Sequence, residues 1–68
     1  MEKSKGMMPI GGRKIKVYEI ENSSNYTIYE NVKEIEVLTV NDRLFWRLHM
    51  RDKATATFLM KEWNIDCR

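Results

Sequence analysis

The sequence has little of what small secreted or metal-stabilised domains depend on. Its 68 residues contain one cysteine, Cys67, and one histidine, His49. A single cysteine cannot form an internal disulfide, and one cysteine with one histidine cannot complete a structural zinc site. We therefore expect no metal and no cofactor, and we expect Cys67 to be a reduced thiol in a cytoplasmic protein.

Long hydrophobic runs are also missing. The longest uninterrupted apolar run is three residues, so no membrane-spanning helix is expected, and the start lacks the apolar stretch of a signal peptide. With one proline and three glycines the chain is not collagenous or of low complexity. Its 43% hydrophobic and 32% charged content is typical of a folded protein, and its length allows one small domain.

The chain divides into an N-terminal arm and a β domain. Residues 1–12 show no periodicity and end in two glycines, which predicts a mobile arm. From residue 13 to residue 68, β-branched and aromatic residues alternate with charged ones, which predicts strands. The expected strands cover 14–21, 26–30, 33–40, 44–51 and 54–60.

These strands predict an all-β fold, either a curved antiparallel sheet or a small open barrel of about five strands. The tail after residue 60 is expected to end in a turn or a short helical piece. A competing interpretation makes 53–65 a helix, but Thr55 and Thr57 disfavour it because β-branched residues lose side-chain freedom in helices.

The pairing of the last three strands can be predicted from cross-strand chemistry. A two-residue turn at Asn41-Asp42 gives the pairs Thr39 with Leu44, Val37 with Trp46, Ile35 with Leu48, Leu38 with Phe45, Glu36 with Arg47 and Glu34 with His49. A three-residue turn over 51–53 then pairs Met50 with Ala54, Leu48 with Ala56, Trp46 with Phe58 and Leu44 with Met60. One face of this meander is strongly apolar, and most of the other face is polar.

The net charge of +2 conceals three unlike blocks. Residues 1–16 sum to +4, residues 17–42 to −5 and residues 43–68 to +3. Such asymmetry can attract charged partners. Here the acidic and basic blocks are predicted to lie beside each other across the hairpin, where they neutralise each other.

The otherwise polar face carries an apolar cluster formed by Leu38, Phe45 and Leu59, and exposed clusters of this kind are usually interfaces. Two alternatives stand. Either the arm, the first strand or Trp63 covers the cluster within the chain, or a second copy covers it in a homodimer. The polar surface for a ligand or partner is expected to consist of Arg43, Arg47, His49 and Arg51.

Catalysis is not expected. His49 beside Glu34 could act as a base, but no nucleophile accompanies the pair, so we predict a protein without enzymatic activity. The same arginines, the interleaved aromatic residues and the basic arm could instead bind single-stranded nucleic acid or a nucleotide. Glu34 and Glu36 beside Arg47 oppose that alternative, because a nucleic-acid footprint needs cations clustered without acids.

The stretch YENVKEIEV, followed by a hairpin and an aromatic strand, resembles small β-sheet accessory proteins of Gram-positive phages and prophages. The resemblance covers residues 14–65 and implies a compact, often dimeric protein. It also implies an inhibitor that binds a host protein or sequesters a small signalling molecule. The resemblance assigns no site residue.

Overall fold

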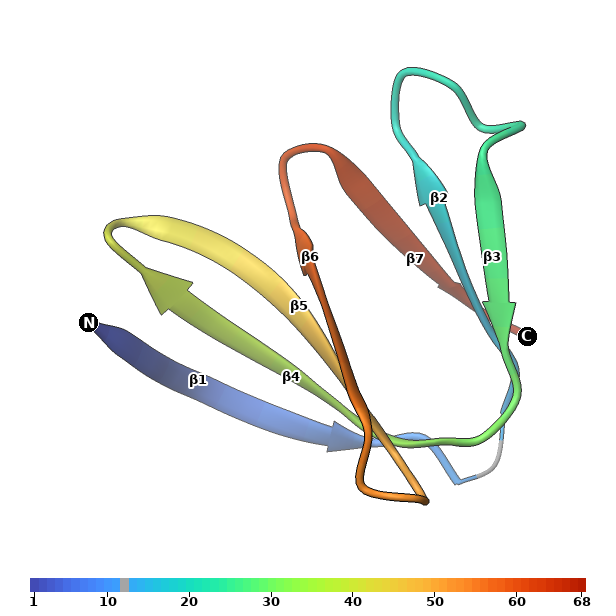
Figure 1. The fold of residues 1–68 in the computed structure, drawn as a ribbon, viewed down its shortest axis with the longest axis horizontal. Helices are drawn as coiled ribbons and strands as arrows, with labels where there is room; N and C mark the ends of the chain where they lie inside the picture. Colours follow the sequence, from blue (N-terminus) through green and yellow to red (C-terminus); the bar gives the residue numbers. More distant parts are fainter. Residues whose placement is uncertain (12) are drawn as a thin grey trace.

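A computed structural model describes residues 1–11 and 13–68, and this part of the chain consists of seven strands joined by turns (Figure 1). The strands are β1 (Glu2–Pro9), β2 (Ile15–Glu19), β3 (Tyr26–Tyr29), β4 (Val32–Val40), β5 (Arg43–Met50), β6 (Thr55–Leu59) and β7 (Trp63–Cys67). The all-β prediction is confirmed. The helix considered for 53–65 is absent, because this stretch holds β6, a turn and the start of β7.

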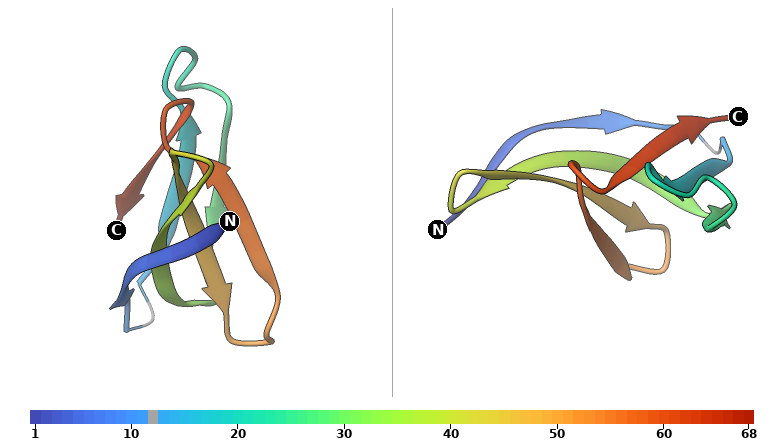
Figure 2. Two further views of the ribbon diagram at one scale, coloured as in Figure 1. Left: turned by 90° about the vertical axis from the view of Figure 1, so that its left-hand side faces the viewer. Right: turned by 90° about the horizontal axis from the view of Figure 1, so that it is seen from above.

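The strands form two antiparallel sheets, one with the order β1-β4-β5-β6 and one with the order β3-β2-β7. The three-stranded sheet lies at the end of the molecule away from the β4–β5 turn (Figures 1 and 2). In the described part of the chain neither sheet closes on itself, so the open-barrel alternative does not describe the fold.

The predicted pairing of β4 with β5 is confirmed at every position. Its turn residues, Asn41 and Asp42, have φ angles of 50° and 65°, as a type I′ turn requires. The observed pairs include Val37 with Trp46, Glu36 with Arg47 and Glu34 with His49. The cross-strand chemistry and the turn therefore specify the same register.

The pairing of β5 with β6 also follows the prediction. Trp46 lies opposite Phe58 and Leu48 opposite Ala56, and the Met50 N–H donates to the Ala54 carbonyl at 2.9 Å. The turn over 51–53 contains no glycine. Lys53 adopts the left-handed conformation instead, with a φ of 74°, at a modest conformational cost.

The core lies between the two sheets, on the face of the meander that was predicted to be apolar. Ile35 and Leu48 of the four-stranded sheet pack against Ile15 and Val17 of the three-stranded sheet. The buried cluster is Ile10, Ile15, Val17, Val32, Ile35, Leu48 and Met50, with Tyr29, Trp46, Ala56, Phe58, Trp63 and Ile65 packed against it. Aromatic contacts cross the gap between the sheets, since Phe58 lies 6.2 Å from Tyr29 and 5.6 Å from Trp63 between ring centroids.

The prediction of a mobile N-terminal arm is wrong for the described residues. Strand β1 pairs with β4, with Lys3 opposite Thr39 and Met7 opposite Glu36. The register shifts by one residue between Ser4 and Gly6, which marks a β-bulge at Lys5. Gly12, the last residue of the predicted arm, lies outside the described residues.

The count of about five strands is therefore too low. Strand β1 replaces the arm, and β7 replaces the expected turn or helical piece at the C-terminus. All side chains of β1 are exposed, so burial imposes no alternation on them. The missing periodicity in the sequence reflects an edge position and not disorder.

Two leucines on the same face of β5 provide a test of where the core ends. Leu48 has no exposed area, whereas Leu44 is 41% exposed. We expect Leu48→Ala to lower the free energy of unfolding by about 2–5 kcal/mol. We expect Leu44→Ala to lower it by about 1 kcal/mol or less.

Urea denaturation followed by tryptophan fluorescence measures both changes. A core of this size supplies only about 3–5 kcal/mol, so the Leu48→Ala protein should be largely unfolded without denaturant. Equal losses in the two variants would contradict the placement of the core.

Candidate functional site

The outer face of the four-stranded sheet carries a polar network centred on Arg47 of β5. The Arg47 Nη1 and Nη2 atoms donate to the two carboxylate oxygens of Glu2 at 2.6 and 3.0 Å. Its Nε donates to the Thr57 Oγ1 at 3.2 Å. The guanidinium is therefore held from both sides, by β1 and by β6, with the planar two-point geometry that arginine favours for carboxylates.

Glu36 of β4 is the buried anion of this network, with 7% of its surface exposed. His49 Nε2 donates to Glu36 Oε1 at 2.8 Å, and Arg47 Nη1 lies 3.9 Å from the same oxygen. Hydrogen bonds from Ser4 and then from His49 lower the pKa of Glu36, and this effect outweighs the opposing effect of burial. The Arg47 hydrogen bond likewise lowers the pKa of Glu2.

His49 was expected beside Glu34, and the backbone register does place the two residues opposite each other. Its side chain bonds instead to Glu36, the diagonal neighbour on β4. Diagonal cross-strand neighbours lie within reach of long side chains, so the backbone register alone does not determine the partner.

The cluster that was predicted to form an interface is only partly exposed to solvent. Leu38, Phe45 and Leu59 lie side by side across β4, β5 and β6, as expected. Leu38 has no exposed area, however, and Phe45 and Leu59 are half-buried. Ser4 of β1 pairs with Leu38, so the chain's own N-terminal strand flanks the cluster. The expectation that Leu38 anchors an interface is corrected accordingly.

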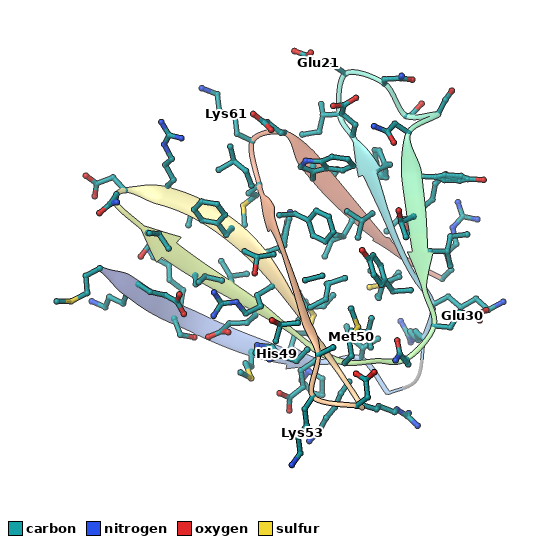
Figure 3. The ribbon with its side chains drawn as sticks, viewed as in Figure 1. Glu21, Glu30, His49, Met50, Lys53 and Lys61 are labelled. Atoms are coloured by element: carbon teal, nitrogen blue, oxygen red, sulfur yellow. The ribbon has the colours of Figure 1, made fainter. Side chains whose placement is uncertain are left out.

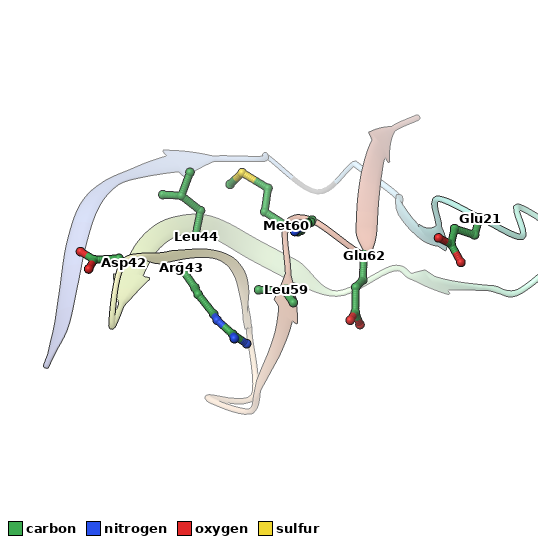
Figure 4. Close-up of a pocket in the computed structure, with 8 residues that line it drawn as sticks. Glu21, Asp42, Arg43, Leu44, Leu59, Met60 and Glu62 are labelled. Atoms are coloured by element: carbon green, nitrogen blue, oxygen red, sulfur yellow. The ribbon is translucent and has the colours of Figure 1, made fainter.

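A recess of about 790 Å³ opens beside the β4–β5 turn (Figure 4), and we call it the hairpin-end recess. It is lined by Glu21, Asp42, Arg43, Leu44, Leu59, Met60, Lys61 and Glu62. Leu44 and Met60 point to one side of the sheet and Arg43 to the other (Figure 4). Leu44 and Met60 continue the apolar face of the meander beyond the end that the three-stranded sheet covers.

The four residues predicted to form one polar surface follow the outer face of β5 from its first residue to the turn after it, but their surroundings differ. Arg43 lines the hairpin-end recess, together with Leu59. Arg47 and His49 belong to the outer-face network, and Arg51 begins the turn that contains Lys53. Figure 3 shows Lys53 at one end of the molecule and Lys61, at the recess, at the other.

The sequence did not identify Leu44 and Met60 as surface residues. Both carry the alternation of a buried face, and their exposure depends on how far the second sheet extends. Glu2 and Ser4 were missed because their segment was expected to be mobile. The only feature of the sequence that could have indicated their role is an acidic and a hydroxyl side chain in an otherwise basic stretch.

Within residues 1–11 and 13–68, no three His, Cys, Asp or Glu side chains gather as a metal site would require. The same part of the chain has no helix that is long and apolar enough to cross a membrane. Comparisons with protein families, curated proteins and solved structures find no match to this chain.

The polar network predicts a specific acid sensitivity. The pKa of Glu36 is lower in the folded chain than in the unfolded chain, so its contribution to stability is complete above the unfolded pKa. That contribution is lost as the pH falls through the folded pKa. Urea denaturation across this acidic range should show a smaller loss of stability in Glu36→Gln than in the unaltered protein.

Glu34→Gln is the matched control, because Glu34 lies on the same strand and forms no ion pair among the described residues. It should keep the acid sensitivity of the unaltered protein. If Glu36→Gln lost stability on acidification as steeply as this control, the role given to the network would be wrong.

Proposed function

We propose that this protein is a non-enzymatic binding protein that docks a partner protein at the hairpin-end recess. The observation that carries the proposal is the exposed apolar continuation of the core face. Leu44 is 41% exposed and lies beside Met60 in a recess lined also by charged side chains. An apolar centre with a polar rim is the usual anatomy of a protein–protein interface.

The charges of the recess favour a protein over a polyanion. Its lining carries three acids, Glu21, Asp42 and Glu62, against two bases, Arg43 and Lys61. Phosphates would meet more acids than bases there, whereas a protein surface can pair with both signs. Arg47 is already bound to Glu2, which leaves it poorly placed to contact a nucleic acid on the outer face.

The shape of the recess favours a protein over a small signalling molecule. Small-molecule sites usually enclose most of the ligand surface. The hairpin-end recess has a volume of about 790 Å³, and its lining side chains do not converge, since Leu44 and Met60 point to one side and Arg43 to the other (Figure 4). A lining that does not enclose one space suits the surface of a macromolecular partner.

We base the proposed biological role of this binding, inhibition of a host process, on the resemblance to phage accessory proteins. Inhibition of a host process by occupying the surface of a host protein needs no catalytic group and no cofactor. A protein of 68 residues with one well-placed apolar site is sufficient for it.

Substitution in the recess tests the proposal. We expect Leu44→Glu to reduce capture of the partner from a Gram-positive host lysate by at least about tenfold, because it charges the apolar centre of the interface. Ile28→Glu is the matched control. Ile28 is 48% exposed on the outer face of the three-stranded sheet, away from the recess.

Quantitative pull-down with each immobilised protein measures the effect, after thermal melts have shown that both variants fold. Capture that is unaffected by Leu44→Glu would contradict the site. Binding of a labelled single-stranded oligonucleotide at low salt, lost at high salt, would contradict the choice of a protein and favour the nucleic-acid alternative.

A further inference from the structure

The two sheets end in four strands with one free side each, namely β1, β6, β3 and β7. A free strand edge presents unpaired N–H and C=O groups and adds another strand unless it is protected. The four edges of this protein differ in how they are protected.

Edge β1 is protected by its sequence and its backbone. It carries Lys3 and Lys5, the register shift of the β-bulge falls at Lys5, and Pro9 has no N–H to donate. Charged side chains, bulges and proline are the features that keep natural edge strands from pairing.

Two backbone groups on edge β7 are bonded to side chains of the same chain. The Trp63 carbonyl accepts a hydrogen bond from Trp46 Nε1 at 3.2 Å. The Ile65 N–H donates to the Asn64 Oδ1 at 2.9 Å. Edge β3 has only four residues, so it offers few groups for pairing.

Edge β6 carries no charged side chain, no proline and no β-bulge. The Met50 N–H donates to the Ala54 carbonyl at 2.9 Å, and the Met60 N–H donates to the Leu44 carbonyl at 3.0 Å. Hydrogen-bonded residues alternate along an antiparallel strand, so the backbone groups of Thr55, Thr57 and Leu59 point away from β5.

Among residues 1–11 and 13–68, the Leu59 carbonyl is the one outward group that is already bonded, since it accepts from the Glu62 N–H at 3.0 Å, and no hydrogen bond reaches the outward backbone groups of Thr55 and Thr57. Both views of Figure 2 show β6 at the border of the four-stranded sheet. The segment 54–60, ATATFLM, contains no charged residue and no proline.

We propose that the outer edge of β6 pairs with the same edge of a second copy, antiparallel and about a two-fold axis through Thr57. This pairing joins two four-stranded sheets into one continuous sheet. The two Thr57 residues lie opposite each other, and Thr55 of each copy lies opposite Leu59 of the other. The outward groups of the two strands then make about four backbone hydrogen bonds, because the two Leu59 carbonyls are already bonded to Glu62 of their own chain.

The segment is complementary to itself in this register, which favours a second copy over a foreign strand. Ala56 of one copy lies opposite Phe58 of the other, so a small side chain faces a large one at both closely spaced positions. Ala54 and Met60 repeat this match at the ends of the segment. No like charges meet within 54–60, although Lys53 of each copy falls opposite Lys61 of the other just beyond the ends of the paired segment.

The size of the domain gives the pairing a physical benefit. A chain of 68 residues without disulfide or metal site has a small core, and chains of this size commonly gain stability by association. Leu59 and Met60 belong both to the paired segment and to the hairpin-end recess, whereas Thr57 belongs only to the paired segment and Leu44 only to the recess. Failure of the dimer would therefore leave the partner-binding proposal standing, and the reverse also holds.

Charges placed on the two-fold axis test the pairing. Analytical ultracentrifugation should give the unaltered protein a mass of twice 8.2 kDa. Thr57→Lys and Thr57→Asp should each sediment at 8.2 kDa, because each places two like charges directly opposite each other. An equimolar mixture of the two variants should recover the doubled mass, since opposite charges then meet on the axis.

Urea denaturation shows that each variant is folded before it is mixed. Amide hydrogen exchange of the unaltered protein gives a second readout that needs no variant, because the Thr57 N–H should become protected as the protein concentration rises. An unaltered protein that remains a monomer would overturn the proposal. So would a dimer that survives both substitutions, or two folded monomeric variants that do not associate on mixing.

Discussion

The fold depends on β4, a strand buried on both of its faces and paired along both of its edges. Ile35 lies in the core between the sheets, whereas Leu38 and Glu36 are buried on the opposite face. Strand β1 bonds to one edge of β4 and β5 to the other. The described chain has no helix to cover a sheet, so burial on the outer face depends on side chains of neighbouring strands. The network of Glu2, Arg47 and His49 around Glu36 follows from this requirement.

The same constraint determines where surface remains for function. The polar groups of the outer face are largely bound to one another, so that face has little left to offer a partner. The three-stranded sheet covers only one end of the core face, which leaves Leu44 exposed and Met60 half-buried beside the β4–β5 turn. Edge β6 lies at the other side of β5 from β4 and lacks the protection of β1. Recognition of a partner and self-association are thus assigned to two adjoining features, which share Leu59 and Met60.

The sequence was sufficient to predict the β4–β5–β6 meander because pairing chemistry and turn geometry agree there. Glu36 opposite Arg47 and Val37 opposite Trp46 leave one acceptable register. Strand β1 could not be predicted, because its exposed side chains carry no alternation and Gly6 follows a bulge. The prediction of the site residues was limited for the same reason. Arg47 was recognised by its charge, but its partner Glu2 belongs to the strand that the pattern did not reveal.

Amide hydrogen exchange along β4 tests the central place of this strand most directly. In a strand with a neighbour on only one side, alternate amides are bonded and the others exchange rapidly. The structure has β1 on one side of β4 and β5 on the other, so the consecutive amides of Ile35, Glu36, Val37 and Leu38 should all exchange slowly. Protection of only every second amide in this stretch would show that residues 2–9 do not pair with β4, and it would contradict the account.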